Sequence, residues 1–133
     1  MTSKRQGMKC KYLIDTSALY PILVSGFPIN GEECAVCTLT EYEIGNVLWK
    51  ENLQKKLEDP KRIAAIFSEA MLPLRKLEID SMSNVLAVAI ERHLTFYDAS
   101  YAYLAEKVAL KLVTEDTDLL KKCKVAISMN EMK

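Results

Sequence analysis

The stretch KYLIDTSAL, residues 11–19, has the composition of a strand that leads directly into a helix. Its apolar run YLI predicts a short buried strand, and Asp15, Thr16 or Ser17 can each cap the helix that follows. The stretch LVTEDTDLL, residues 112–120, repeats this order near the other end of the chain. Short apolar strands separated by helices are typical of a parallel sheet that is covered on both faces.

The segments between these two stretches continue the alternation. Apolar residues recur at helical spacing after several of the intervening strands, which predicts helices there. One of these helices is predicted to begin at Asp59-Pro60, since proline is favoured in the first helical turn. The other predicted strands lie at residues 34–38, 74–79, 111–114 and 125–128. This order predicts an α/β fold, a three-layer α/β/α sandwich around a central, mostly parallel sheet.

The length of 133 residues indicates one domain with a buried core. We expect residues 10–133 to form that domain and residues 1–9 to form a polar tail, with Met1 and Met8 both open as the native start. No apolar run is long enough to cross a bilayer, and no signal peptide is recognisable. The chain is therefore predicted to be cytoplasmic, with no membrane partner.

Charge and cysteine content argue against a broad nucleic-acid binder and against a metal or redox site at the cysteines. The net charge is zero, which argues against broad, sequence-independent binding of nucleic acid through a basic surface. Cys34 and Cys37 have the C-x-x-C spacing of zinc and redox sites, but residues three apart on a strand point to opposite faces. Because His93 is the only histidine, we expect buried thiols here. A zinc site or a disulfide remains an alternative role for this pair.

Four acidic residues are not explained by solvent-facing helices. Asp15 and Asp116 follow strands, Asp98 lies among aromatic residues, and Glu43 lies inside the apolar-rich segment YEIGNVLW. The carboxyl ends of parallel strands meet at one edge of a sheet, where ligands usually bind. Carboxylates gathered there would repel one another unless they held a divalent cation, and oxygen ligands suit Mg²⁺ or Mn²⁺. As an alternative, the three aspartates are ordinary helix caps.

At these residues the chain resembles the PIN-domain family, specifically the VapC-type toxin ribonucleases of prokaryotic toxin–antitoxin pairs. The resemblance implies a PIN-like sandwich and an endoribonuclease that uses Mg²⁺ or Mn²⁺ to cleave single-stranded or looped RNA. It also implies a homodimer and a small antitoxin protein as partners. The stretches that carry it are KYLIDTSAL at 11–19, TEYEIGNVLWK at 40–50, LTFYDASYAYLAEK at 94–107 and LVTEDTDLL at 112–120.

The resemblance also assigns residues to the site. Glu43 is preferred to Glu41, because the family places its acid in an E-x-x-N step, which here ends on Asn46. The residues that it implies for catalysis and metal binding are Asp15, Glu43, Asp98 and Asp116. Those that it implies as polar support are Thr16, Ser17, Asn46 and Thr114, with Asp118 as a possible accessory. A local basic rim would attract RNA, and its candidates are Lys50, Lys55, Arg92 and Lys107.

Other functions remain open at this point. The chain could be a PIN-like subunit that binds RNA or acts as a scaffold without catalysis. It could also be an RNA-processing nuclease outside a toxin–antitoxin pair. An aspartyl-phosphate phosphotransferase is disfavoured, because Ser17 stands where such enzymes commonly carry a second aspartate.

Overall fold

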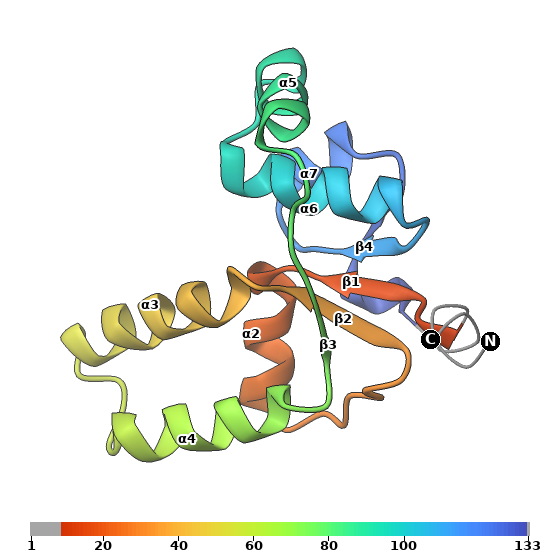
Figure 1. Cartoon of the computed structure of the whole chain (residues 1–133). Helices are drawn as coiled ribbons and strands as arrows, with labels where there is room; N and C mark the ends of the chain where they lie inside the picture. Colours follow the sequence, from red (N-terminus) through yellow and green to blue (C-terminus); the bar gives the residue numbers. More distant parts are fainter. Residues whose placement is uncertain (1–8, 133) are drawn as a thin grey trace.

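The computed structural model describes residues 9–132 and has a five-stranded sheet at its centre (Figure 1). All neighbouring strands run parallel, with Leu13 of the central strand paired to Ala35 on one side and to Leu112 on the other. The strands are β1 (Tyr12–Ile14), β2 (Cys34–Cys37), β3 (Arg75–Leu77), β4 (Lys111–Val113) and β5 (Ala126–Ile127), in the order β3-β2-β1-β4-β5. The predicted parallel α/β sheet is confirmed.

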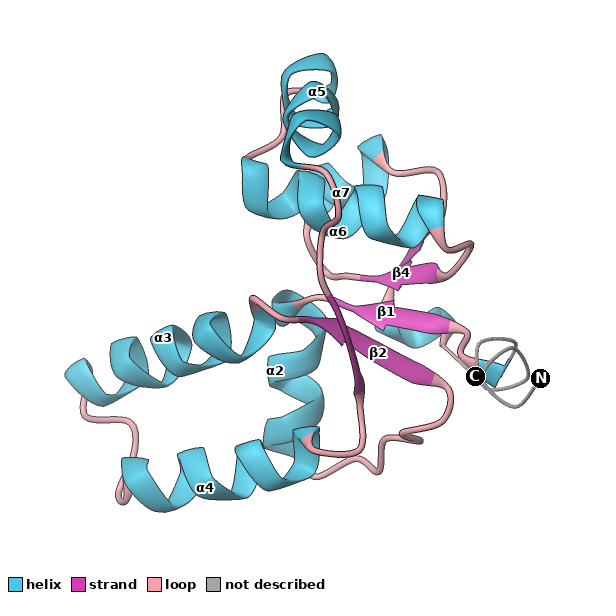
Figure 2. Ribbon diagram, viewed as in Figure 1, coloured by secondary structure: helices cyan, strands magenta, loops and turns pink. Residues whose placement is uncertain are grey.

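Helices cover both faces of this sheet, as Figure 2 shows. On one side lie α2 (Thr16–Ser25), α3 (Thr40–Leu53) and α4 (Pro60–Met71). On the other side lie α5 (Met82–Arg92), α6 (Phe96–Lys107) and α7 (Thr117–Lys122). The two layers of helices with the sheet between them form the predicted sandwich.

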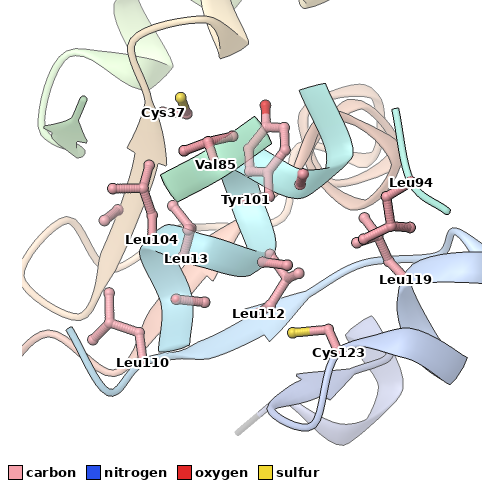
Figure 3. Packing of buried hydrophobic residues seen from close by; sticks show 14 of the residues in the cluster. Leu13, Cys37, Val85, Leu94, Tyr101, Leu104, Leu110, Leu112, Leu119 and Cys123 are labelled. Carbon is pink, nitrogen blue, oxygen red and sulfur yellow. The ribbon is translucent and has the colours of Figure 1, made fainter. Parts of the chain in front are cut away.

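The strands alternate between two hydrophobic cores, because successive side chains on a strand point to opposite faces. Leu13 and Leu112 pack with Val85 and Tyr101 beneath the α5–α6 layer (Figure 3). Ile14 and Val113 pack on the other face, against α2 and its neighbours. Burying each such aliphatic side chain contributes about 1.5–3 kcal/mol, so both faces stabilise the sheet.

The C-x-x-C pair is divided between these cores. Cys34 lies in the α2 core and Cys37 in the α5–α6 core, and all four cysteines are buried free thiols. Burial raises the pKa of the Cys34 thiol to about 12 and also raises the pKa of Cys37. The expectation of buried thiols is correct, and two thiols on opposite faces of a strand cannot share a zinc ion or a disulfide.

Helix boundaries follow the predicted caps closely. The carboxylate of Asp59 accepts a hydrogen bond from the backbone of Arg62 at 3.2 Å, and Pro60 is the first residue of α4. The predicted tail falls outside the described residues except for Lys9, which pairs with Glu32 at 3.5 Å. Within the described part of the chain, no helix is both long and apolar enough to cross a membrane.

Several large apolar residues on the helices are exposed. Tyr42 on α3 is 78% exposed, and Leu86 and Ile90 on α5 are 48% and 68% exposed. Each of these helices buries only a narrow stripe, such as Ile44 on α3 and Val85 on α5. Periodicity identifies an apolar face, but it does not say whether the same chain covers that face.

Candidate active site

Asp15 and Asp116 both cap helices at the carboxyl edge of the sheet. Asp15 follows β1, and its Oδ1 accepts from the backbone N–H of Ala18 at 3.1 Å at the start of α2. Asp116 Oδ1 accepts from the N–H groups of Asp118 and Leu119 at 2.8 and 3.1 Å at the start of α7. The capping interpretation is therefore correct for both, at about 1 kcal/mol each. It is wrong for Asp98, which lies in the first turn of α6, because Thr95 caps that helix and accepts from the Asp98 N–H at 3.1 Å. Capping does not exclude a ligand role, since each carboxylate has a second oxygen.

Hydroxyl groups fix the orientation of Asp15. Ser17 Oγ donates to Asp15 Oδ1 at 2.7 Å, and Thr114 Oγ1 donates to Oδ2 at 2.5 Å. Thr114 is fully buried just after β4, where its Oγ1 also accepts from the backbone N–H of Asp116 at 3.0 Å. One threonine hydroxyl thus joins the carboxylate after β1 to the chain after β4. This contact gives Thr114 a means of orienting Asp15.

The charges at this edge influence one another. Burial raises the pKa of Asp15, repulsion from Asp116 adds to the rise, and the hydrogen bonds from Thr114, Ser17 and Ala18 oppose it. For the half-buried Asp98 at the start of α6, the pKa is raised to about 6, first by burial and then by repulsion from Asp116, Asp15 and Glu43. A carboxyl group perturbed by three others marks one electrostatic cluster, which is typical of functional sites.

Glu43 is held by a directed chain of hydrogen bonds in the first turns of α3. The N–H of Cys37 donates to Thr40 Oγ1 at 3.1 Å, and Thr40 Oγ1 lies 2.7 Å from the hydroxyl of Tyr101. That hydroxyl donates to Glu43 Oε1 at 2.6 Å, and Thr16 Oγ1 donates to the same oxygen at 2.8 Å. Since the N–H can only donate and the carboxylate can only accept, the protons of the chain all point toward Glu43.

Tyr101 and Thr40 are site residues that the sequence reasoning missed. Both are buried, and burial together with the hydrogen bond to Glu43 raises the pKa of Tyr101, so the phenol remains a donor. The sequence did contain a signal for Tyr101. It stands three positions after Asp98, so the two side chains are neighbours along one face of α6. Thr40 likewise stands three positions before Glu43 on α3, but its contact with Tyr101 joins residues 61 positions apart and has no local signal.

The remaining predicted residues lie further out. Asn46 is exposed one turn after Glu43, and Asp118 is exposed on α7 with its backbone N–H bonded to Asp116. Of the residues predicted for a basic rim, Lys50 and Lys55 are exposed, whereas Arg92 and Lys107 are engaged in ion pairs. Arg92 makes a two-pronged ion pair with Glu106 at 2.7 and 2.8 Å, and Lys107 pairs with Asp80.

The donor set fits a hydrated hard cation. The charged groups at this edge are carboxylates, whose oxygens are the ligands that Mg²⁺ and Mn²⁺ prefer. Among residues 9–132, no three Asp, Glu, His or Cys side chains converge closely enough to enclose one ion by themselves. Carboxylates that are spread apart yet repel one another suit an ion that keeps several of its own waters, as Mg²⁺ does.

Comparisons with known proteins cover nearly the whole chain. Residues 12–125 match the PIN domain family. A protein named Exonuclease VapC9 from Pyrobaculum aerophilum is 41% identical over 127 residues, which are 94% of this chain and 95% of that protein. Ribonuclease VapC3 from the same organism is 31% identical over 124 residues, which are 84% and 94% of the two chains. The crystal structure of PAE2754 from Pyrobaculum aerophilum superposes with a TM-score of 0.86 at 41% identity, over 94% of this chain and 88% of that one.

Proposed function

This chain belongs to the PIN domain family, and on that premise we propose that it is a divalent-metal-dependent endoribonuclease and the toxin of a type II toxin–antitoxin pair. The family and the VapC relatives support a nuclease. The observation that carries the finer proposal is the cluster of four carboxylates, in which Asp98 is repelled by the other three. Such a cluster lowers the stability of a protein unless a cation binds it, so a role in metal binding explains its presence.

The proposed roles follow from the contacts of each side chain. Asp15, Asp98 and Asp116 would hold Mg²⁺ or Mn²⁺, which when bound polarises a phosphodiester and lowers the pKa of a bound water. Thr114 and Ser17 keep Asp15 in place for this task. Both hydrogen bonds to Glu43 use Oε1, so its Oε2 is left to accept a proton from the water that attacks phosphorus.

The partners are proposed from the exposed apolar faces and from the relatives. The substrate is single-stranded or looped RNA, and a small antitoxin protein would cover the site. A second copy of the chain would cover the stripe of α5 formed by Met82, Leu86 and Ile90, which are 72%, 48% and 68% exposed. These residues are spaced four apart, so they form one continuous helical face of the kind that packs in dimers.

One relative is named an exonuclease, so a nuclease that digests RNA from its ends is the second candidate. A covalently closed RNA circle and a linear RNA of the same sequence, each incubated with the protein and Mn²⁺, separate the two. We expect the circle to be opened, because an endonuclease needs no free end, and we expect EDTA to prevent this. Digestion of the linear RNA with an intact circle would identify an exonuclease, and two intact RNAs would favour a binding subunit without catalysis.

Tyr101→Phe is expected to lower kcat for RNA cleavage by about tenfold to a hundredfold and to leave KM nearly unchanged. The change removes one hydrogen bond to a charged acceptor, worth about 1.5–3 kcal/mol, and leaves Thr16 as the remaining donor that orients the Glu43 carboxylate. The matched control is Tyr103→Phe on the same helix, whose hydroxyl donates to Asp80 at 2.8 Å on the surface.

Initial rates over a range of RNA concentrations, with melting curves of both variants, measure this effect. The control should cleave at the wild-type rate. An equal loss in the two variants, or a loss that appears only in KM, would mean that Tyr101 does not position Glu43 for the reaction.

A further inference from the structure

A cavity of about 380 Å³ opens directly beside Glu43. It lies between the start of α3 and the start of α6, and besides Glu43 it is lined by Tyr42, Tyr97, Asn46 and Thr16. Thr16 donates to Glu43, so the cavity is continuous with the carboxylate cluster. We name it the two-tyrosine cavity. Its volume is sufficient for one planar aromatic group, such as a nucleobase.

Two large aromatic side chains are exposed at this cavity. Tyr42 is 78% exposed and Tyr97 is 57% exposed. Proteins that bind unpaired RNA place such rings where bases can stack on them, and stacking tolerates every base because each has a π face. The amide of Asn46 adds a donor and an acceptor at the rim, which suit the polar edge of a base.

The charge around the cavity favours bases over phosphates as the groups that bind. No lysine or arginine is among the residues that line it, and Arg92 and Lys107 are engaged in ion pairs elsewhere. The nearby carboxylates repel a phosphate backbone. Contacts with the uncharged bases are therefore the interactions that the lining residues offer an RNA strand, and the exposed Lys50 of α3 lies outside this lining.

We propose that the two-tyrosine cavity is a subsite that stacks an unpaired nucleobase next to the phosphodiester to be cut. The proposal rests on the proposed nuclease function and adds to it the part of the substrate that is recognised. A base paired in a duplex cannot enter, so the subsite restricts the enzyme to single strands and loops. Because the lining supplies no cation to a phosphate, the part of the affinity that the subsite contributes depends only weakly on salt.

Binding of a labelled single-stranded RNA oligonucleotide, followed by fluorescence anisotropy in EDTA, tests the subsite without cleavage. The comparison probe is an abasic ribose-phosphate chain of the same length and charge. We expect wild type to bind the abasic chain about fivefold to a hundredfold more weakly, the range found for base stacking on aromatic side chains. We expect Tyr42→Leu combined with Tyr97→Leu to weaken binding of the intact RNA to the same extent, with no change for the abasic chain.

The control variant is Trp49→Leu, which removes an aromatic ring that is 57% exposed on α3 but does not line the cavity. It should bind both probes like wild type. Equal affinity of wild type for the two probes, no measurable binding of intact RNA, or an equal loss in the control would each overturn the subsite. If one of these results were found and circular RNA were still cleaved, the subsite would be rejected and the nuclease proposal would remain. If binding depended on the bases as expected but the protein cut no RNA, only the nuclease proposal would be contradicted.

Discussion

Asp98→Asn should raise the melting temperature of the metal-free protein at pH 7 by about 4 °C while abolishing RNA cleavage, since roughly 1 kcal/mol moves Tm by this amount in a chain of this size. The gain arises because folding raises the pKa of Asp98 from 3.8 to about 6. Between these values the folded state holds a proton that the unfolded state has released, so stability falls as pH rises through the interval. A shift of about two units corresponds to ~3 kcal/mol, and half-exposure of the side chain reduces this to ~1 kcal/mol.

Melting curves in EDTA across this pH range measure the effect. The two proteins should melt alike well below the lower pKa, where Asp98 is neutral in both states, and the difference in Tm should be complete above the upper pKa. Added Mn²⁺ should raise Tm of wild type but not of the variant, because a ligand that binds only the folded state stabilises it.

The matched control is Asp80→Asn, which removes an acidic charge that pairs with Lys107 on the surface. This control should gain no stability and should keep full activity. A lower Tm for Asp98→Asn at neutral pH would show that its neighbours do not repel Asp98. Cleavage at the wild-type rate would show that Asp98 is not needed for the reaction.

Thr114→Val should destabilise the protein by about 2–3 kcal/mol at neutral pH, because a buried carboxylate loses a donor and a partly buried N–H loses its acceptor. The two lost bonds are those to Asp15 Oδ2 at 2.5 Å and from the N–H of Asp116 at 3.0 Å. The shape of the side chain hardly changes, so packing is not the cause. Cleavage should fall at least about tenfold, since Asp15 loses its fixed orientation.

The pH dependence of this loss has a defined sign. Burial already raises the pKa of Asp15 above its ordinary value, and the Thr114 hydroxyl opposes that rise. Valine would raise the pKa further, so the difference from wild type should be largest where Asp15 is charged and should shrink as pH falls and the folded state takes up a proton. Denaturant unfolding at neutral and acidic pH measures both limits.

Thr114→Ser serves as the control, because it keeps the hydroxyl and loses only a methyl group. It should retain most of the activity and show little change in the pH dependence of stability. A valine variant as stable and as active as the serine variant would show that the hydroxyl bridge between β1 and β4 does not hold Asp15 in place.

Local sequence was enough to predict the sheet, several helix starts, and the place of Asp15 and Asp116 after their strands. A run such as YLI followed by Asp15 determines a buried strand and a cap within a few residues, and Asp116 follows β4 in the same way. Parallel strands bring their carboxyl ends to one edge, so the neighbourhood of Asp15 and Asp116 follows from local patterns and a general rule of topology. The opposite faces of Cys34 and Cys37 follow from the period of a strand alone.

Only the tertiary structure decided which distant groups meet and which faces stay uncovered. The hydroxyl of Thr114 reaches Asp15 across 99 residues of chain, and that of Tyr101 reaches Glu43 across 58. Neither separation along the chain corresponds to a helical or strand repeat, so no local sequence pattern reveals these contacts. The exposure of Tyr42 and the ion pair between Arg92 and Glu106 likewise depend on which elements pack together in the fold. The amphipathic pattern of a helix records that a residue is apolar or charged, whereas its partner depends on how separate elements pack in space.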